Sequence, residues 1–382
     1  MVKKILNFLI FFLLILTFFL ISDFFLSKNT RLFHVKKDCF KYLKLQINNK
    51  DYYSYELEKN CFAIEHKSVA PSYNVFTDNL GNRVAKNKLK NKEKKDKILF
   101  LGDSFTYGFG VNYEDSVPGK IDKKTNEIYE IVNFAMPGYS PSINLFKLNN
   151  YLKKSNNVTI KKVFYILDLT DVHDESNRWL NIENLNTPVI IDESIKDEIK
   201  KTFEVKESLR ATRFLSYLIN KNVRNLRKRF NNYFSDSESK DPIDTGTYWG
   251  KFTHTAQSKL KKDKEYNALW QNDFEIGLKN IKIKLKEISD TLKPYNTEFY
   301  IVIHPWRETL EFGQAEFNWE KFAEEACFLA ECKKVISIFD DVKKIKNSNP
   351  FWKTEIYFPR DVHFNKKGNN LYSDRIYIEA FR

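Results

Sequence analysis

Several features that mark common protein classes are scarce or missing in this sequence. It has no internal repeat and no proline-rich linker, so it is not an array of repeated units. Its 4 cysteines do not form closely spaced pairs beside a histidine, which argues against a zinc motif. Residues 108–110 (GFG) lack the lysine and the spacing of a phosphate-binding loop. With only 6 histidines, the chain also offers few candidates for a general base.

Aromatic and basic side chains, in contrast, are abundant. An aromatic content of 15% indicates a folded chain, and 382 residues can bury a large α/β core with an appendage. The net charge of +13 would suggest nucleic acid as the partner of a cytoplasmic protein. Outside the cytoplasm it points instead to lipid headgroups or an acidic polymer, and a solvated lysine-rich surface is the simpler explanation. We therefore expect no nucleic-acid partner.

The amino-terminal segment 5–26 is almost wholly apolar, and about 20 such residues suffice to span a bilayer. We interpret it as a membrane anchor. A cleaved signal peptide is the alternative, but the run is long for one and no small-x-small cleavage site follows. Lys3 and Lys4 favour a cytoplasmic amino end, so the rest of the chain is expected outside the cytoplasm, which is the periplasm if the cell is Gram-negative. We expect the anchor at 1–27 and a neck or cap at 28–95.

An extracytoplasmic location affects how the cysteines are interpreted, because disulfides persist there. Sequence neighbours suggest that Cys39 pairs with Cys61 and Cys327 with Cys332. Four cysteines allow three connectivities, and four buried thiols remain an alternative.

Strand-like and helix-like segments alternate through the rest of the chain, 96–382. This alternation predicts a flavodoxin-like three-layer α/β/α fold with a parallel sheet of about five strands. The predicted strands are 98–101, 128–134, 162–167, 298–303 and 335–339, and the predicted helices are 142–152, 273–292, 319–333 and 367–380. A polar segment at about 177–262 interrupts the pattern, and we interpret it as a helical insertion whose basic face carries Arg210, Arg213, Arg224, Arg227 and Arg229.

The first predicted core strand leads directly to a candidate nucleophile. Residues 97–110 read KILFLGDSFTYGFG, an apolar run that ends at Gly102 and is followed by Ser104. Ligands bind at the carboxyl edge of open α/β sheets, which is where this serine falls. Asp103 and Ser104 are also favoured helix caps, so a capped helix is the simpler alternative.

A serine hydroxyl needs a base, and a histidine oriented by a carboxylate can provide it. His363 follows Asp361 by two residues, in a loop that opens the last predicted helix. His173 and His304 each follow a predicted strand and could also approach the edge of the sheet. The other three histidines, His34, His66 and His254, lie in the neck or the insertion.

Three blocks of the sequence resemble the SGNH (GDSL-type) hydrolase superfamily. They are residues 102–105 (GDSF), residues 133–140 (NFAMPGYS) and Asp361-x-His363 near the carboxyl end, in the family order. The resemblance implies a catalytic triad of Ser104, Asp361 and His363. It also implies an oxyanion hole built from the backbone N–H groups of Ser104 and Gly138. The tight Asp-x-His spacing resembles membrane-linked relatives that act on exported polysaccharides.

At the position of the family's third block, this chain departs from the family pattern. The family has Gly-x-Asn-Asp, whereas this chain has LDLTDV at 167–172, so Thr170 stands where the family has its asparagine. A threonine hydroxyl can donate one hydrogen bond but is shorter than an amide. Loss of one oxyanion donor can cost about 10²- to 10³-fold in rate.

Substrate contacts are expected at the end of the fourth strand, in His304-Pro-Trp-Arg307. Trp306 could stack on a sugar ring, and Arg307 could bind a carboxylate or phosphate. A strand-end turn whose tryptophan fills the core is the alternative.

Taken with the resemblance, these features predict a serine-dependent ester hydrolase or O-acyltransferase that needs neither a metal nor another cofactor. Its expected substrates are acyl esters, above all acetyl groups of a cell-envelope or exported polysaccharide. Two alternatives stay open: a lipase or lysophospholipase-like esterase, and a catalytically weak polysaccharide-binding or assembly protein.

Overall fold

The computed structural model describes residues 38–47, 50–65, 70–88, 96–125, 128–154, 159–178, 264–314, 317–359 and 361–382, with residues 7, 10–12, 14–15 and 17–18 near the amino end. Two compact units share the chain. The larger one is formed by Lys36–Ile190 with Ile243–Arg382, and the other by Met1–Val35 with Ile191–Pro242.

Two predicted segments fall mainly outside the described residues. Of the predicted anchor at 5–26, only scattered positions between 7 and 18 are described, and these are helical. Of the predicted insertion at 177–262, only residues 177–178 are described. Within the described parts of the chain, no helix has the length and apolar character needed to cross a membrane.

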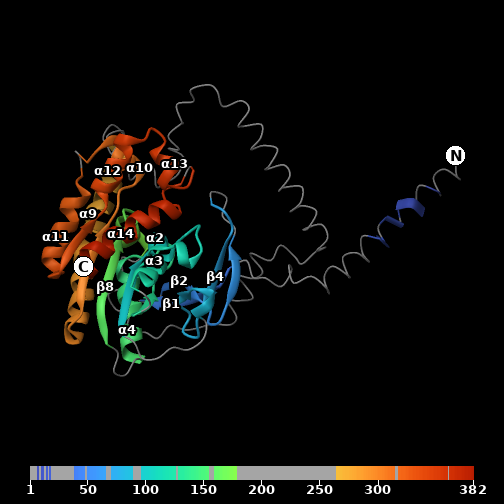
Figure 1. Ribbon diagram of the computed structural model, residues 1–382, viewed down its shortest axis with the longest axis horizontal. Helices are drawn as coiled ribbons and strands as arrows, with labels where there is room; N and C mark the ends of the chain where they lie inside the picture. Colours follow the sequence, from blue (N-terminus) through green and yellow to red (C-terminus); the bar gives the residue numbers. More distant parts are fainter. Residues whose placement is uncertain are drawn as a thin grey trace. The chain divides into compact units, whose positions relative to one another are not determined.

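A parallel sheet of five strands forms the centre of the larger unit (Figure 1). Its strands are β6 (Lys97–Gly102), β7 (Glu130–Asn133), β8 (Ile160–Leu167), β9 (Glu298–Ile303) and β10 (Lys334–Ser337). The order across the sheet is β10-β9-β8-β6-β7, and every neighbouring pair is parallel. Numbered along the chain, these core strands follow the flavodoxin-like order 2-1-3-4-5. The prediction of a five-stranded parallel sheet is therefore confirmed.

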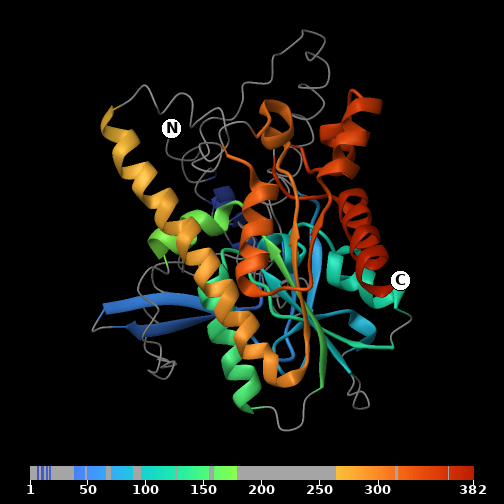
Figure 2. The ribbon, with the colours of Figure 1, turned by 90° about the vertical axis from the view of Figure 1, so that its left-hand side faces the viewer.

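Helices cover both faces of this sheet, which explains why its strands are continuous apolar runs. On one face, α4 (Pro141–Lys154) and α11 (Trp319–Ala330) both pack against the long helix α9 (Lys264–Leu292). On the other, α3 (Val117–Lys124) packs against α14 (Lys366–Phe381). Figure 2 shows the sheet between these two layers, as the three-layer prediction requires.

Shorter helices connect the main elements at the two ends of the sheet. They are α2 (Ser104–Tyr107), α5 (Thr170–His173), α10 (Arg307–Phe312), α12 (Phe339–Ser348) and α13 (Trp352–Ile356), with the single turns η2 (Lys86–Lys88), η3 (Tyr113–Asp115), η4 (Asp174–Arg178) and η7 (Lys293–Tyr295).

The region predicted as a neck or cap contains two small antiparallel sheets. One is the hairpin of β1 (Phe40–Ile47) and β2 (Lys50–Leu57), and the other, which we call the accessory sheet, has β3 (Phe62–Glu65), β4 (Tyr73–Thr77) and β5 (Arg83–Val84). Buried residues of this region share a hydrophobic cluster with residues of the α/β part, namely Tyr107, Ala135, Met136, Tyr139 and Ile143. The region thus packs directly on the part of the chain that carries Ser104.

Both suggested disulfides are present. Cys39 bonds to Cys61, across a Cα–Cα distance of 5.8 Å, and ties the start of β1 to the start of the accessory sheet. Cys327 bonds to Cys332 at the end of α11, with a Cα–Cα distance of 4.9 Å.

A sharp turn at the end of β6 places Ser104 at the sheet edge. Gly102 has φ +142, and a Cβ there would lie 2.3 Å from Thr106 Oγ1 and 2.7 Å from the Ile166 carbonyl oxygen. Asp103 then caps α2, since its carboxylate accepts a hydrogen bond from the Phe105 N–H. From β6 the chain continues to β7 on one side of β6 and then to β8 on the other side. Open α/β sheets bind ligands at the carboxyl edge where the strand order changes direction in this way, and Ser104 lies there.

Candidate active site

The structure brings three predicted residues together from opposite ends of the α/β part. Ser104 Oγ lies 2.7 Å from His363 Nε2, although the two residues are 259 positions apart. On the other side of the ring, His363 Nδ1 hydrogen bonds with Asp361 Oδ1. Asp361 Oδ1 also accepts the backbone N–H of His363 at 2.8 Å. Because each imidazole nitrogen has one partner, the ring is held in a single orientation between the serine and the carboxylate.

The loop that carries Asp361 and His363 is closed by its own backbone. Tyr357 and Phe364 form an isolated antiparallel bridge, and the Phe358 N–H donates to the His363 carbonyl at 2.9 Å. Asn365 caps α14 with its side-chain oxygen, while its amide donates to carbonyl groups of the preceding segment. These bonds hold the backbone of the loop on which Asp361 and His363 lie two residues apart.

The carboxyl group of Asp361 is charged at neutral pH. Burial by itself raises its pKa, but hydrogen bonds from the ring and backbone of His363, with the positive charge of Arg307, lower the pKa below its usual value. A carboxylate in this state can hold the Nδ1 proton of His363 and stabilise the ring when it becomes positively charged.

Two aromatic rings flank the imidazole of His363. The ring of Phe109 stacks on it at a centroid distance of 4.3 Å, and that of Phe105 lies 4.7 Å away at an angle of 32°. Both come from the segment that begins with Ser104, so nucleophile and base are packed together as one unit. Aromatic faces attract cations, which favours the protonated ring that forms when the serine reacts.

The candidate oxyanion residues come from three neighbouring strand ends. Gly138 lies in the loop after β7 with φ +72, a conformation that suits glycine. This loop is tied to α2 because the Asn133 amide donates to the Thr106 carbonyl at 3.1 Å. Thr170 begins α5, after β8.

The Thr170 hydroxyl is bound by buried carboxylates. Thr170 Oγ1 lies 2.5 Å from Asp168 Oδ2 and 3.4 Å from Asp103 Oδ2. Ser104 Oγ lies 3.3 Å from the same oxygen of Asp103. A hydroxyl has one proton, and the short distance directs that of Thr170 to Asp168. The residue expected to complete the oxyanion hole therefore contacts two buried carboxylates, one of which, Asp103, also contacts the nucleophile.

The two carboxylates, Asp103 and Asp168, differ in acidity. Burial raises the pKa of Asp103 well above its usual value, and the charges of Asp168 and Asp174 raise it further. Burial acts in the same direction on Asp168, but contact with His304 and the hydrogen bonds from Thr170 lower its pKa to about 2. The pKa of Asp103 is thus displaced upward and that of Asp168 downward, so Asp168 is the stronger acid of the pair.

Trp306 does not line a substrate site, which corrects one prediction. It is 2% exposed, and its indole N–H donates to Asp168 Oδ1 at 2.8 Å. The fully buried ring has no face available to a sugar, so the alternative, a tryptophan that fills the core, is right. His304 lies beside it, with Nε2 3.1 Å from Asp168 Oδ1 and Nδ1 3.2 Å from the Tyr372 hydroxyl.

Arg307 lies close enough to Asp361 for its charge to lower the pKa of that carboxyl. Its guanidinium also donates to Glu308 at 3.3 Å. Its contact with substrate stays a prediction.

Of the remaining histidines, the structure describes His173, at the end of α5. The carbonyl of His173 accepts a hydrogen bond from Ser176. His34, His66 and His254 lie outside the described residues.

Sequence reasoning missed the supporting roles of Asp103, Asp168 and His304. Both aspartates stand within the quoted blocks, and His304 was placed at the correct edge. Their mutual contacts depend on strands β6, β8 and β9 lying side by side, which local sequence patterns do not specify.

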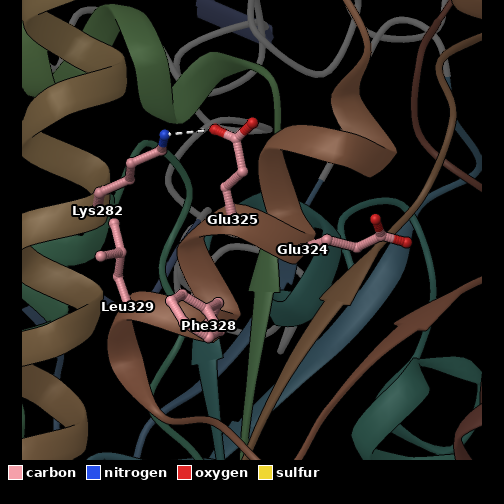
Figure 3. A pocket seen from close by; sticks show the side chains of 5 residues that line it. All are labelled: Lys282, Glu324, Glu325, Phe328 and Leu329. Carbon is pink, nitrogen blue, oxygen red and sulfur yellow. Dashed lines mark hydrogen bonds and ion pairs between the residues drawn. The ribbon is translucent and has the colours of Figure 1, made fainter.

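Two hollows on the surface lie at different places relative to Ser104 and His363. The pocket in Figure 3 lies on α9 and α11, is lined by Lys282, Glu324, Glu325, Phe328 and Leu329, and includes none of the site residues. Another hollow, of about 510 Å³, lies between the loop after α2 and the loop of His363; its lining includes Gly110, Val111, Asn112, Phe358 and Asn365. Among the described residues, no group of three or more side chains is arranged to bind a metal ion.

No protein-family model matches the chain, and no curated protein matches it either. Among solved structures it is similar to the psychrotrophic esterase EstA from Pseudoalteromonas sp., with 13% identity over 74% of this chain and 96% of that chain and a TM-score of 0.37. It is also similar to a member of the lipolytic protein G-D-S-L family from Veillonella parvula (10% identity, 75% and 97% coverage, TM-score 0.36). A third is the acetylxylan esterase Axe2 from Geobacillus stearothermophilus (11% identity, 76% and 98% coverage, TM-score 0.38). With identities and TM-scores this low, we transfer no activity from these proteins.

Proposed function

We propose that this protein is a serine ester hydrolase of the SGNH (GDSL) type. The observation that supports this most directly is the 2.7 Å contact between Ser104 Oγ and His363 Nε2, on a ring whose other nitrogen is bound by Asp361. This is the arrangement in which a base can take the proton of a serine hydroxyl during attack.

In the proposed reaction, His363 accepts the proton of Ser104 as the serine oxygen attacks the ester carbonyl. The backbone N–H groups of Ser104 and Gly138 stabilise the negative charge that develops on the carbonyl oxygen. The imidazolium then protonates the departing alcohol and leaves an acyl group on Ser104. A water molecule, activated by the same histidine, releases the acid and restores the serine.

The substrates we propose are acyl esters on a glycan, with acetyl as the acyl group. The sequence blocks resemble those of relatives that act on exported polysaccharides, which supports a glycan as the alcohol part of the ester. Transfer of the acyl group to a sugar hydroxyl is the corresponding acyltransferase reaction. A location outside the cytoplasm, with the amino-terminal segment as an anchor, belongs to the same proposal.

Hydrolysis of an aryl acetate by the purified full-length protein tests the proposal. We expect turnover by the wild type and its loss in Ser104→Ala. Ser348→Ala, which changes an exposed serine on α12, is the matched control and should keep wild-type turnover. Equal rates for wild type and Ser104→Ala would contradict the proposal. An acetylated polysaccharide, compared with a phospholipid, then separates the glycan substrate from the lipase alternative.

A further inference from the structure

Arg83, on β5 of the accessory sheet, reaches into the segment that follows the candidate nucleophile. The residue is completely buried, with 0% of its surface exposed. Its guanidinium donates hydrogen bonds to the carbonyl groups of Tyr107 (2.5 Å), Gly108 (2.8 Å) and Val111 (2.5 Å). One side chain therefore binds three backbone carbonyls within five residues. Arginine suits this task because its planar fork of N–H groups can serve several acceptors at once.

The charge of Arg83 is accommodated by two aromatic rings, one on β4 of the accessory sheet and one on helix α2. Its guanidinium carbon lies 4.6 Å from the ring centre of Tyr107 and 5.3 Å from that of Tyr73. Both tyrosine hydroxyls donate to the buried carboxylate of Glu65, at 2.8 Å and 2.5 Å. Each strand of the accessory sheet thus contributes one residue to this cluster, β3 through Glu65, β4 through Tyr73 and β5 through Arg83.

The segment held by Arg83 carries a side chain that contacts the candidate base. Phe109 lies between the bound carbonyls, and its ring stacks on His363 at 4.3 Å. On either side of it, Gly108 and Gly110 have φ +86 and +80. This backbone path is one that residues with side chains rarely adopt, so it needs the fixed carbonyl contacts to stay in place.

We propose that Arg83 is a positioning residue for the active site, acting through the backbone of residues 107–111 to hold Phe109 against His363. The accessory sheet is then part of the catalytic structure, although no residue of it touches the reacting atoms. The consequence for turnover rests on the proposed ester hydrolysis, whereas the packing of Phe109 on His363 does not.

Steady-state kinetics of the full-length protein with an aryl acetate form the first test. We expect Arg83→Met to lower kcat by about 10- to 100-fold, since small misplacements of catalytic groups have effects of this size. KM should change by no more than about twofold, because Arg83 does not touch substrate. Arg83→Lys, which keeps the charge, should recover part of the loss. Arg375→Met, which removes a guanidinium on α14 that donates to Asp341 on α12, is the control and should keep wild-type kcat.

A double-mutant cycle tests whether Arg83 acts through Phe109. Phe109→Leu alone should lower kcat, and Arg83→Met combined with Phe109→Leu should be no slower than the worse single variant. Losses that multiply would show that Arg83 and Phe109 act independently and would overturn the proposal.

Carbethoxylation of His363 provides a readout that does not depend on turnover. The modification rate, followed by peptide mass spectrometry, should rise several-fold in Arg83→Met and in Phe109→Leu, because the stacked ring no longer shields the imidazole. Arg83→Lys and Phe109→Leu serve for this comparison if Arg83→Met does not fold. An unchanged rate in folded variants would overturn the proposal. If the rate rises but wild type shows no ester hydrolysis, the proposed function fails and the packing role stands.

Discussion

At the scale of single residues, the chemistry of the site depends on the partner of each polar hydrogen. Ser104 faces His363, and the Thr170 hydroxyl faces Asp168. A donor already bound to a carboxylate is poorly placed to stabilise an oxyanion. In the proposed mechanism the oxyanion therefore depends on backbone N–H groups, and Thr170 contacts the buried carboxylates behind the serine.

This assignment of Thr170 predicts a small effect on rate. We expect Thr170→Val to lower kcat less than about tenfold, whereas removal of a true oxyanion donor costs about 10²- to 10³-fold. The variant should be less stable by about 1–3 kcal/mol, because Asp168 loses a hydrogen bond in a buried position. Aryl acetate hydrolysis and thermal unfolding measure the two effects, with Thr170→Ser as the control that keeps the hydroxyl. A hundredfold loss of kcat in Thr170→Val would make it an oxyanion donor instead.

Sequence reasoning selected the residues of the triad because their motifs are local. Asp361 and His363 lie on one short loop, and Ser104 directly follows an apolar strand. Trp306 was misassigned as a substrate contact, since a tryptophan at a strand end fits a pocket wall and a core position equally well. Only the partner of its indole N–H, Asp168, settles that question. Arg83 has no local motif, because three of the backbone carbonyls to which it donates lie 24 to 28 residues further along the chain.

At the scale of elements, the turn between β6 and α2 is the most constrained connection near the site. We predict that Gly102→Ala destabilises the protein by several kcal/mol, since its Cβ would meet the Ile166 carbonyl at 2.7 Å in addition to backbone strain. Gly313→Ala is the matched control: Gly313 also has positive φ (+82), but a Cβ there meets nothing within 4 Å. Its cost should be only the strain of positive φ with extended ψ, about 1–3 kcal/mol. Equal losses in chemical denaturation would show that the close approach does not matter.

The two disulfides close loops of different length and should differ in effect. Cys39 and Cys61 are separated by 22 residues, and Cys327 and Cys332 by 5. Loop-closure entropy predicts a loss of about 3 kcal/mol when the first pair is changed to alanine and about 2 kcal/mol for the second. Chemical denaturation of the two double variants measures this, and the opposite order would contradict the entropic explanation.

The main helices and strands could be predicted where apolar residues recur with the period of a helix or run continuously through a strand. Strand β9 was predicted with its exact bounds, and α9 and α14 were recognised, although α9 begins earlier than expected. The accessory sheet was not, because β5 is two residues long and is defined by pairing with β4. Short strands held by tertiary contacts leave no periodic signal in the sequence.

At the scale of the whole molecule, buried acidic groups lie behind the nucleophile and link stability to pH. Asp171 is 0% exposed, and its Oδ1 has no hydrogen-bond partner among the described residues. Burial, followed by the charges of Asp103 and Asp168, raises its pKa well above the usual value. The folded protein therefore favours the protonated form of Asp171. The stability that this preference contributes is fully present below the unfolded-state pKa of about 4, and it is lost as the pH rises through the folded-state pKa.

Replacement of Asp171 by a neutral side chain should remove this loss of stability at higher pH. We expect Asp171→Asn to match the wild-type free energy of unfolding near about pH 4 and to exceed it increasingly as the pH rises towards the folded-state pKa of Asp171, by ~1.4 kcal/mol for each pH unit between the two pKa values. Calorimetry across this range measures the difference, and Asp340→Asn, which changes an exposed carboxylate on α12, is the control. A difference that shrinks with rising pH would show that Asp171 is charged in the folded protein.

The reactivity of Ser104 towards a fluorophosphonate tests the central claim most directly. The full-length protein would be treated with the probe and the modified residue identified by peptide mass spectrometry. An activated serine should be labelled at Ser104, and the labelling should be lost in His363→Ala, which removes the base. Absence of labelling at Ser104, or labelling that is unaffected by His363→Ala, would contradict the account.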